Sequence, residues 1–169
     1  MSAFVKICGP VVADTVYCEN VLVARDVSVT LPEIVAMTAE VQAMGNLTIP
    51  IWQLLEHMET AITKIGVDIG LTSLVKPDMK PIEVRWVQTV TDANGTTKNV
   101  GCKAFITGIP TKIPGVGLEI GATIESEVTL ATTRYNLFVD GREMFLIDKL
   151  SGICRIDGKD YAGDIGSML

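Results

Sequence analysis

The sequence predicts a mainly β fold with one short helix. Two observations support this prediction: residue pairs that favour tight turns, and the alternation of apolar with polar residues. Three Asp-Gly or Asn-Gly pairs stand between β-rich apolar runs: Asp140-Gly141, Asp157-Gly158 and Asn94-Gly95. Such a pair favours a hairpin, because a tight turn needs positive φ and glycine adopts it easily. Apolar and polar residues also alternate over residues 26–31, which indicates a strand with one buried face.

Further elements follow from local patterns in the first two thirds of the chain. Residues 11–31 are expected to form a strand, a turn and a second strand. Residues 67–75 favour a short helix, because Asp68 can cap the first turn and the apolar residues after it share one face. Residues 82–92 and 96–108 form the predicted hairpin around the Asn-Gly pair.

The last third of the chain predicts a loop and the strands that close the sheet. Residues 109–121 are rich in proline and glycine and are expected to form a loop. Residues 122–140 predict one long strand, or two strands joined by a bend, with residues 142–148 as the hairpin partner. Residues 152–161 are expected to close the sheet. No repeat or composition shift marks a boundary, so residues 1–169 are expected to form a single domain.

Local rules conflict between residues 45 and 66. Four apolar residues recur there at the spacing of an amphipathic helix: Leu54, Met58, Ile62 and Ile65. The segment METAITKI, however, is also acceptable as a strand rich in β-branched residues. In the preceding NLTIPIWQ, Pro50 excludes a central strand. These local patterns leave helix and strand open.

The composition leaves two interpretations of the apolar residues open. Hydrophobic residues make up 48% of the chain and aromatic residues only 5%, so the apolar mass is mostly aliphatic. Mean hydropathy is +0.38, which is high for a globular domain. A well-packed β-rich core accounts for this composition. An apolar surface that becomes buried only when copies assemble accounts for it equally.

The charge balance argues against a direct nucleic-acid binder. The chain carries 14 basic and 20 acidic residues, and its lysines and arginines form no run. A protein that binds phosphates directly needs a basic patch. The net charge of −6 is typical of a soluble surface, and it would also let nucleic acid pass without adhering.

The cysteine pattern predicts neither a disulfide framework nor a zinc site. The four cysteines form no CxxC pair, and His57 is the only histidine. Each cysteine is expected to be a small buried hydrophobic residue. Scattered cysteines without a cleavable signal sequence favour synthesis in a reducing, intracellular compartment. No apolar run approaches the ~20 residues that cross a bilayer, so we expect a soluble protein without a membrane anchor.

No motif in the sequence predicts cofactor or metal binding. Residues 115–117 read Gly-Val-Gly but lack the spacing of a dinucleotide fingerprint and of a P-loop. Residues 157–164 hold three aspartates but lack the terminal glutamate of an EF-hand calcium loop. We therefore expect no cofactor and no metal.

The titratable residues also predict no catalytic site. Glu125 and Glu127 lie two residues apart on one strand face, and paired carboxylates can serve acid–base chemistry. Two like charges on the solvent face of a strand are far more common. His57 has no serine or cysteine nucleophile near it in the sequence. A hydrolase that uses these residues is an alternative without further support, and the chain is expected not to be an enzyme.

The order YNLFVDGREMFLID…IDGKD, within residues 135–160, resembles the C-terminal pattern of the major tail tube protein of contractile-tailed phages, which R-type bacteriocin tubes share. In that family a long strand ends in Asp-Gly, a short strand ends in Ile-Asp, and an Asn/Asp-Gly-x-Asp turn follows. The matching positions here are Asp140-Gly141, Ile147-Asp148 and Asp157-Gly158-Lys159-Asp160, with Thr30-Leu31-Pro32 matching the end of an early strand. Length and element order fit over nearly the whole chain.

The resemblance implies a tail-tube β-barrel or sandwich whose strands join a ring-wide barrel on oligomerisation. It also implies an extended hairpin around residues 45–66 that reaches toward the next ring, which favours strands for NLTIPIWQ and METAITKI. The subunits are expected to form hexameric rings that stack into a hollow tube inside a contractile sheath. Closing a sheet between subunits removes edge strands that would otherwise aggregate.

The implied function is that of a structural subunit of the inner tail tube of a contractile injection system. Such a tube conducts DNA or punctures the cell envelope when the sheath contracts. Its expected partners are other copies of itself, the tail sheath protein, tape-measure and baseplate proteins, and DNA that passes without specific binding. The expected location is a virion tail or bacteriocin particle, assembled in the host bacterial cytoplasm. Glu125 and Glu127 then become candidate lumen-facing residues, whose charge would repel passing phosphates.

Two other functions remain open at this point. A ring-forming tube protein of a bacterial contractile secretion system would keep the fold and differ only in the system it serves. A β-barrel ligand-binding module would instead stay monomeric and enclose an apolar cavity.

Overall fold

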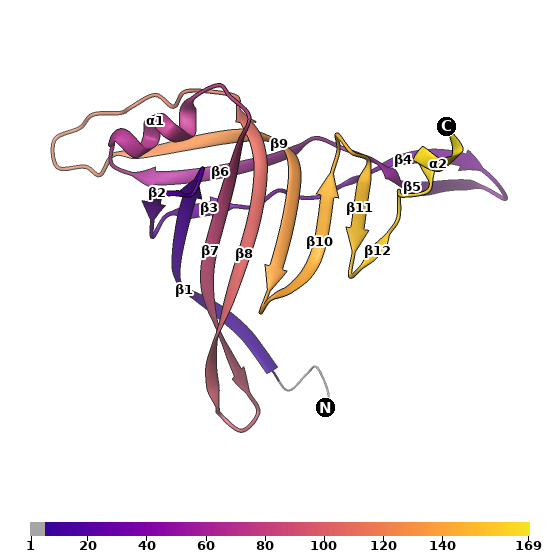
Figure 1. Ribbon diagram of the computed structural model, residues 1–169, viewed down its shortest axis with the longest axis horizontal. Helices are drawn as coiled ribbons and strands as arrows, with labels where there is room; N and C mark the ends of the chain where they lie inside the picture. The colour runs from indigo at the N-terminus through magenta and orange to yellow at the C-terminus, as the bar shows by residue number, and fades with distance from the viewer. Residues whose placement is uncertain (1–5) are drawn as a thin grey trace.

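The computed structural model describes residues 6–169 as a ten-stranded antiparallel sheet, a separate two-stranded hairpin and two helices (Figure 1). The strands are β1 (Lys6–Cys18), β2 (Val21–Arg25), β3 (Ser28–Thr30), β4 (Ala36–Gln42), β5 (Asn46–Leu55), β6 (Met58–Ile65), β7 (Lys80–Asp92), β8 (Thr97–Pro110), β9 (Glu125–Val139), β10 (Arg142–Asp148), β11 (Ile153–Ile156) and β12 (Lys159–Asp160). The helices are α1 (Ile69–Val75) and α2 (Ile165–Met168). The predicted mainly β class and the helix after Asp68 are confirmed, whereas the single turn of α2 is an additional helix that the sequence did not predict.

The sheet is organised around β9, whose two halves pair with different strands. Residues 125–132 pair with β6, and residues 134–139 pair with β10. On its other side β9 pairs with β8, and the order continues through β7 and β1 to β2. We call β1, β7, β8, the second half of β9 and β10 the main sheet. In Figure 1, β6 and the start of β9 run across the direction of the main-sheet strands.

A bulge at Thr133 changes which side chains of β9 are buried. The register between β8 and β9 shifts there, so that Thr133 is passed over in the pairing. Val128 and Leu130 are buried before the bulge, and Tyr135 is buried after it. The extra residue thereby lets both halves of the strand direct apolar side chains into one core. The structure resolves the predicted alternative of one strand or two in favour of one bulged strand.

The main core lies between the main sheet and the layer of β6, with α1 covering one end. Its buried members come from seven elements: Val16, Cys18, Val23, Ala24, Ile62, Leu71, Leu74, Ile82, Val84, Ala104, Ile106, Val128, Leu130 and Tyr135. Burial raises the pKa of Tyr135 to about 12, so its hydroxyl stays protonated at neutral pH. A second, smaller core joins β6 to the C-terminal strands through Met58, Ile147, Cys154 and Ala162.

The strand prediction for METAITKI is confirmed, because residues 58–65 form β6. Its side chains alternate between buried and less buried positions, with Met58 and Ile62 fully buried. The helical spacing in this segment is therefore coincidental, since Leu54 belongs to a different strand. Pairing with β3 and β9 supplies the backbone hydrogen bonds that a helix would otherwise make.

The predicted position of the extended hairpin, around residues 45–66, is wrong. β5 pairs with β4, so the hairpin comprises residues 36–55, and β6 belongs to the large sheet. The N–H of Glu56 donates to the carbonyl of Val35 at 2.8 Å and closes the base of the hairpin. The next strand, β6, pairs with β3 and β9 and not with the hairpin.

Two of the three predicted turn pairs have both residues at positive φ. These pairs are Asp140-Gly141, with φ of 51° and 78°, and Asp157-Gly158, with φ of 49° and 83°. The Asn-Gly turn differs from the two-residue turn that its sequence indicates, because Gly95 has a φ of 78° and Asn94 does not have positive φ. The Asp92 carboxylate accepts hydrogen bonds from the N–H groups of Asn94 and Thr96, which favours a longer loop.

Two nearly buried lysines hold α1 at both ends. Lys64 donates to the carboxylate of Asp68, which also accepts the N–H of Leu71 as the helix N-cap. Lys80 donates to the carbonyls of Ser73 and Lys76 at 2.7 Å, where the last helical turn leaves acceptors free. Burial lowers the pKa of Lys80, whereas the hydrogen bond from Lys64 lowers the pKa of Asp68. The helix is therefore fixed at both ends by lysines that flank it closely in the sequence.

Replacing Asp68 with alanine is expected to lower the free energy of unfolding by about 1–2 kcal/mol, since it removes the N-cap acceptor and the partner of Lys64. Asp68→Asn should keep most of the cap. Because the pKa of Asp68 is lower in the folded state, its charge stabilises the fold above the ordinary aspartate pKa of about 3.9, and the benefit is lost as the pH falls through the folded pKa. Urea unfolding of both variants across this range checks the prediction. A constant gap between wild type and Asp68→Ala would contradict it.

Candidate assembly surfaces

The β4–β5 hairpin has one wholly apolar face. Three cross-strand pairs form it: Met37 with Ile51, Ala39 with Ile49, and Val41 with Leu47. The opposite face is formed by Thr38 with Pro50, Glu40 with Thr48, and Gln42 with Asn46. Exposed fractions on the apolar face range from 41% at Ile49 to 49% at Leu47 among its large exposed residues. We call these six residues the apolar hairpin face, and nothing in residues 6–169 covers it.

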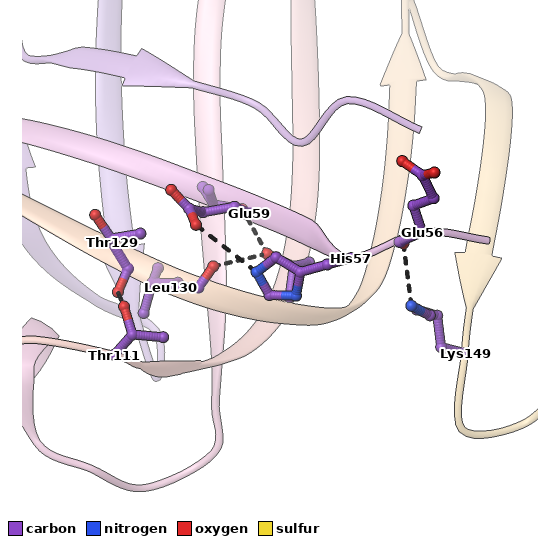
Figure 2. A network of polar contacts seen from close by, with 9 residues as sticks. Glu56, His57, Glu59, Thr111, Thr129, Leu130 and Lys149 are labelled. Carbon is purple, nitrogen blue, oxygen red and sulfur yellow. Dashed lines mark hydrogen bonds and ion pairs between the residues drawn. The ribbon is translucent and has the colours of Figure 1, made fainter. Parts of the chain in front are cut away.

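Within the described residues 6–169, the hairpin is anchored at its base. Lys149 Nζ, in the turn after β10, donates to the carbonyl of Glu56 at 3.0 Å, and the imidazole of His57 lies 3.7 Å from the Glu59 carboxylate (Figure 2). Beyond this base the hairpin projects past the C-terminal strands at one end of the molecule (Figure 1). The side chain of His57 lies at the surface, with an exposed fraction of 63%.

The side of the main sheet and of the adjoining β11 that faces away from the core carries three arginine–carboxylate pairs. Their distances are 2.5 Å for Arg85 and Glu83, 2.7 Å for Arg155 and Glu143, and 3.9 Å for Arg134 and Asp148. In each pair the carboxylate is more buried than the arginine, whose head group lies outermost. We call this surface the open sheet face. Its paired charges leave it close to neutral, in contrast to the acidic chain as a whole.

Aromatic side chains lie between these charged pairs. The rings of Phe105 and Phe138 meet edge to face, with centroids 5.7 Å apart. The guanidinium of Arg85 lies 4.6 Å from the centre of the Tyr17 ring. Both contacts join side chains of neighbouring strands across the open sheet face and stabilise their packing there.

Glu125 and Glu127 are both exposed, and they lie on the first half of β9. Lys112 Nζ lies 3.4 Å from Glu127, so one of the two charges is partly compensated. Thr129, two residues further along the strand, is buried with 6% exposure, and its carbonyl accepts the N–H of Thr111 from the β8–β9 loop. Pairing of the first half of β9 with β6 places these glutamates in the layer of β6, separate from the open sheet face.

The two Asp-Gly turns lie next to each other, whereas Asn94-Gly95 lies at the tip of the β7–β8 hairpin. Arg142, just after the first turn, donates to the carboxylate of Asp157 in the second turn at 2.5 Å. The N–H of Asp157 also donates to the carbonyl of Met144. The backbone conformation of the Asp-Gly pairs forms the turns that connect the strands.

The cysteines are free thiols, and three of them are buried as predicted. Burial raises the pKa of Cys18, Cys102 and Cys154, which keeps these thiols protonated and unreactive at neutral pH. Cys8 is exposed on β1, which corrects the expectation that every cysteine is buried. Across residues 6–169, no cluster of three or more histidine, cysteine or acidic side chains could hold a metal ion.

None of the helices in the described part of the chain is long and apolar enough to cross a membrane.

Comparison with known proteins places this architecture in a family. The family model of phage tail tube protein FII matches residues 12–169. The chain belongs to the phage tail tube protein FII family. It is a structural tail tube protein, which confirms the expected family and function. No curated protein matches its sequence.

Two solved structures share the fold of this tail tube protein. One is an extracellular contractile injection system, the PVC sheath-tube complex in the extended state, with 16% identity, a TM-score of 0.56, and coverage of 76% of this chain and 90% of that chain. The other is the PVC sheath/tube terminator in the extended state, with 15% identity, a TM-score of 0.52, and coverage of 77% and 96%.

For the tail tube protein, the surface missed by sequence reasoning is the apolar hairpin face. A signal for it was present, because apolar residues alternate with polar ones in AMTAEVQ and again in NLTIPI, on either side of Met44-Gly45. Both turn residues have positive φ, 53° and 116°. Read as a hairpin, the two alternating segments would have shown one apolar and one polar face.

Proposed function

We propose that this protein is the tube-forming subunit of a contractile injection system, and that its copies form hexameric rings stacked into a hollow tube within a sheath. Residues 1–169 act as a single tail tube domain with the hairpin of residues 36–55 as its extension. Family membership over residues 12–169 supports this proposal, as does the shared fold with the PVC sheath-tube complex. The role is structural, without catalysis.

The observation that carries the proposal is the uncovered apolar hairpin face. An isolated two-stranded hairpin is at best marginally stable in water. Its six apolar residues contribute little to stability as long as their face is exposed to solvent. Assembly with further copies removes this surface from water. The second interpretation of the composition, burial on assembly, is therefore the one we adopt.

The edge of β1 supports closure of the sheet between subunits. The start of β1, Lys6–Cys8, pairs with β7 but not with β2, whose pairing begins at Thr15. Within residues 6–169 the outer backbone groups of this segment have no strand partner, so they can continue the sheet into a neighbouring copy. A barrel that spans the ring would satisfy these groups and leave a wide channel.

Two surfaces are candidates for the channel wall. The acidic-wall hypothesis assigns Glu125 and Glu127 to the channel, where they would repel phosphates. The open sheet face offers a near-neutral wall instead, since its arginines are paired with carboxylates. Either wall would let DNA pass without specific binding.

The remaining partners follow from the proposed role. A tube within a sheath contacts the sheath protein along its outer surface, and tape-measure and baseplate proteins would adjoin it in a complete particle. The location is then a virion tail or a related injection particle, assembled in the host cytoplasm. A secretion-system tube would have the same subunit fold and different partners.

Electron microscopy of the purified protein tests the proposal. Rings or hollow rods are expected in negative stain, and a reconstruction of the rods should show sixfold rings with either Glu125 and Glu127 or the open sheet face at the channel. Carboxylates of both glutamates on the outer surface would overturn the acidic-wall hypothesis. Uniform monomers over a wide concentration range would contradict the tube and favour a monomeric binding module.

A further inference from the structure

The tip of the β7–β8 hairpin carries an Asn-Gly pair that is open to solvent. Asn94 and Gly95 follow the last cross-strand pair of this hairpin, Thr91 with Thr97, and both are exposed. The hairpin projects beyond the rest of the sheet at the bottom of Figure 1. Asn94 is held by its backbone N–H, which donates to the Asp92 carboxylate at 3.1 Å, and not by its side-chain amide. This amide is therefore free to rotate toward the backbone that follows it.

The residue after Asn94 leaves its backbone nitrogen accessible. Gly95 has a φ of 78° and no side chain that could shield its nitrogen. Apart from its chain neighbours, no atom lies within 4 Å of the position that a Cβ would occupy. A bond from this nitrogen to Cγ of Asn94 would close a five-membered ring. Because both groups belong to one short stretch of chain, the attack is effectively unimolecular.

We propose that Asn94 is a site of spontaneous deamidation, at which the hairpin tip gains a negative charge without an enzyme. A base from solvent takes the proton of the Gly95 N–H, and the nitrogen attacks Cγ of Asn94. The new N–Cγ bond replaces the bond from Cγ to Nδ2, and ammonia leaves with a proton from solvent. Water then opens the cyclic imide. Attack at Cγ breaks the new bond and gives aspartate, whereas attack at the backbone carbonyl breaks the bond to Gly95 and gives isoaspartate.

Hydrogen bonds around Asp92 control how fast this reaction occurs. The N–H of Gly95 donates to the Asp92 carbonyl at 3.0 Å, so the attacking nitrogen is held in the turn. The Asp92 carboxylate also accepts the N–H groups of Asn94 and Thr96 at 3.1 and 3.0 Å. The turn must open locally before the ring closes, and exposed hairpin tips open at little cost in free energy. The turn therefore slows the reaction without preventing it.

The reaction changes both the charge and the backbone of the tip. Each deamidated subunit carries one more negative charge, so its net charge goes from −6 to −7. The new carboxylate lies in the same turn as that of Asp92. Isoaspartate also adds a methylene group to the path of the backbone, so the hydrogen bonds of the turn cannot keep their present geometry. The charge at the tip thus depends on the age of the protein, whether or not its copies form a tube.

Other turns of the chain supply internal controls. Asn20 also lies in an exposed turn, between β1 and β2, but Val21 follows it. The branched side chain of valine shields its own nitrogen, so deamidation at Asn94 should be about tenfold faster than at Asn20, or more. In the Asp-Gly turns the attack would fall on a negatively charged carboxylate, and Asp157 is also held by Arg142.

Peptide mapping by mass spectrometry of the full chain, aged at mildly alkaline pH, tests the proposal. The peptide that contains Asn94 should gain about 1 Da and separate into aspartate and isoaspartate forms. Asn94→Gln should abolish the gain, because a longer side chain cannot close the same ring. An unchanged mass at Asn94 would overturn the proposal, and so would a gain without isoaspartate, since direct hydrolysis gives aspartate alone. Equal rates at Asn94 and Asn20 would contradict the role of Gly95.

Two variants of Asp92 separate the hydrogen bonds of the turn from its charge. Asp92→Ala should accelerate deamidation about fivefold, because the N–H groups of Asn94 and Thr96 lose their acceptor. Asp92→Asn is the matched control, since it also removes the charge but keeps a side-chain oxygen, and it should accelerate the reaction less. Equal rates in the two variants would contradict the control of the reaction by these hydrogen bonds.

Discussion

Gly108→Ala is expected to lower the free energy of unfolding of the subunit by about 1–3 kcal/mol, a cost typical of overpacking. A Cβ at this position would lie 2.8 Å from the carbonyl oxygen of Ala131. That oxygen belongs to the backbone of β9, directly before the bulge at Thr133, and cannot move away as a flexible side chain would. The added methyl group would therefore displace the backbone of β9 at the bulge. This displacement would disturb the switch in which side chains of β9 are buried.

Gly101→Ala is the matched control on the same strand. Its added Cβ meets nothing within 4 Å, so the subunit should be unaffected or become more stable by up to about 1 kcal/mol, as alanine restricts the unfolded chain. Urea unfolding of both variants measures the difference. Equal losses of unfolding free energy from the two substitutions would contradict the argument that Gly108 is needed for the close approach of β8 and β9.

Amide hydrogen exchange in the hairpin of residues 36–55 is expected to be faster than in β7, β8 and β9 by about a thousandfold or more in the unassembled subunit. The hairpin's hydrogen bonds connect only β4 with β5, and its apolar face is open to water. The central strands, by contrast, are paired on both sides and border the main core. In assembled tubes the hairpin amides should become protected, because a second copy covers them.

Exchange followed by mass spectrometry on free subunits and on tubes checks this prediction. The β7–β8 turn around Asn94 serves as the internal control, since it lies at a hairpin tip as well but has no large apolar face. If the hairpin amides of the free subunit exchanged as slowly as those of β8, the argument that the hairpin is stabilised mainly by assembly would be contradicted.

Most strands could be predicted from local patterns, and the errors share one cause. The long β9, the turns after Asp140 and Asp157, and the cap at Asp68 all depend on residues a few positions apart. The hairpin was misplaced because the partner of β5 lies before it in sequence, where β4 had not been assigned. The resemblance to tail tube proteins favoured strands in this region correctly, but it did not identify which strands pair.

The candidate surfaces were less predictable than the fold. The sequence predicts Glu125 and Glu127 as an exposed pair, yet the ion pair of Glu127 with Lys112 depends on how the β8–β9 loop folds back. Two of the three arginine–carboxylate pairs of the open sheet face join different strands and cannot be predicted from local patterns. Arg155 and Glu143, for example, meet only because β10 and β11 pair in one particular register.

By itself the sequence determined the β class, the two Asp-Gly turns, the helix cap and the family, since these depend on local conformational preference and on the order of short motifs. Only the tertiary structure decided that β9 serves two layers, that a bulge at Thr133 exchanges its buried face, and that residues 36–55 form a hairpin with one apolar side. Strand pairing joins segments far apart in the chain, and a shift of one residue reverses which face is buried. The register of strand pairing therefore also decides which apolar surfaces are exposed for contact with other copies.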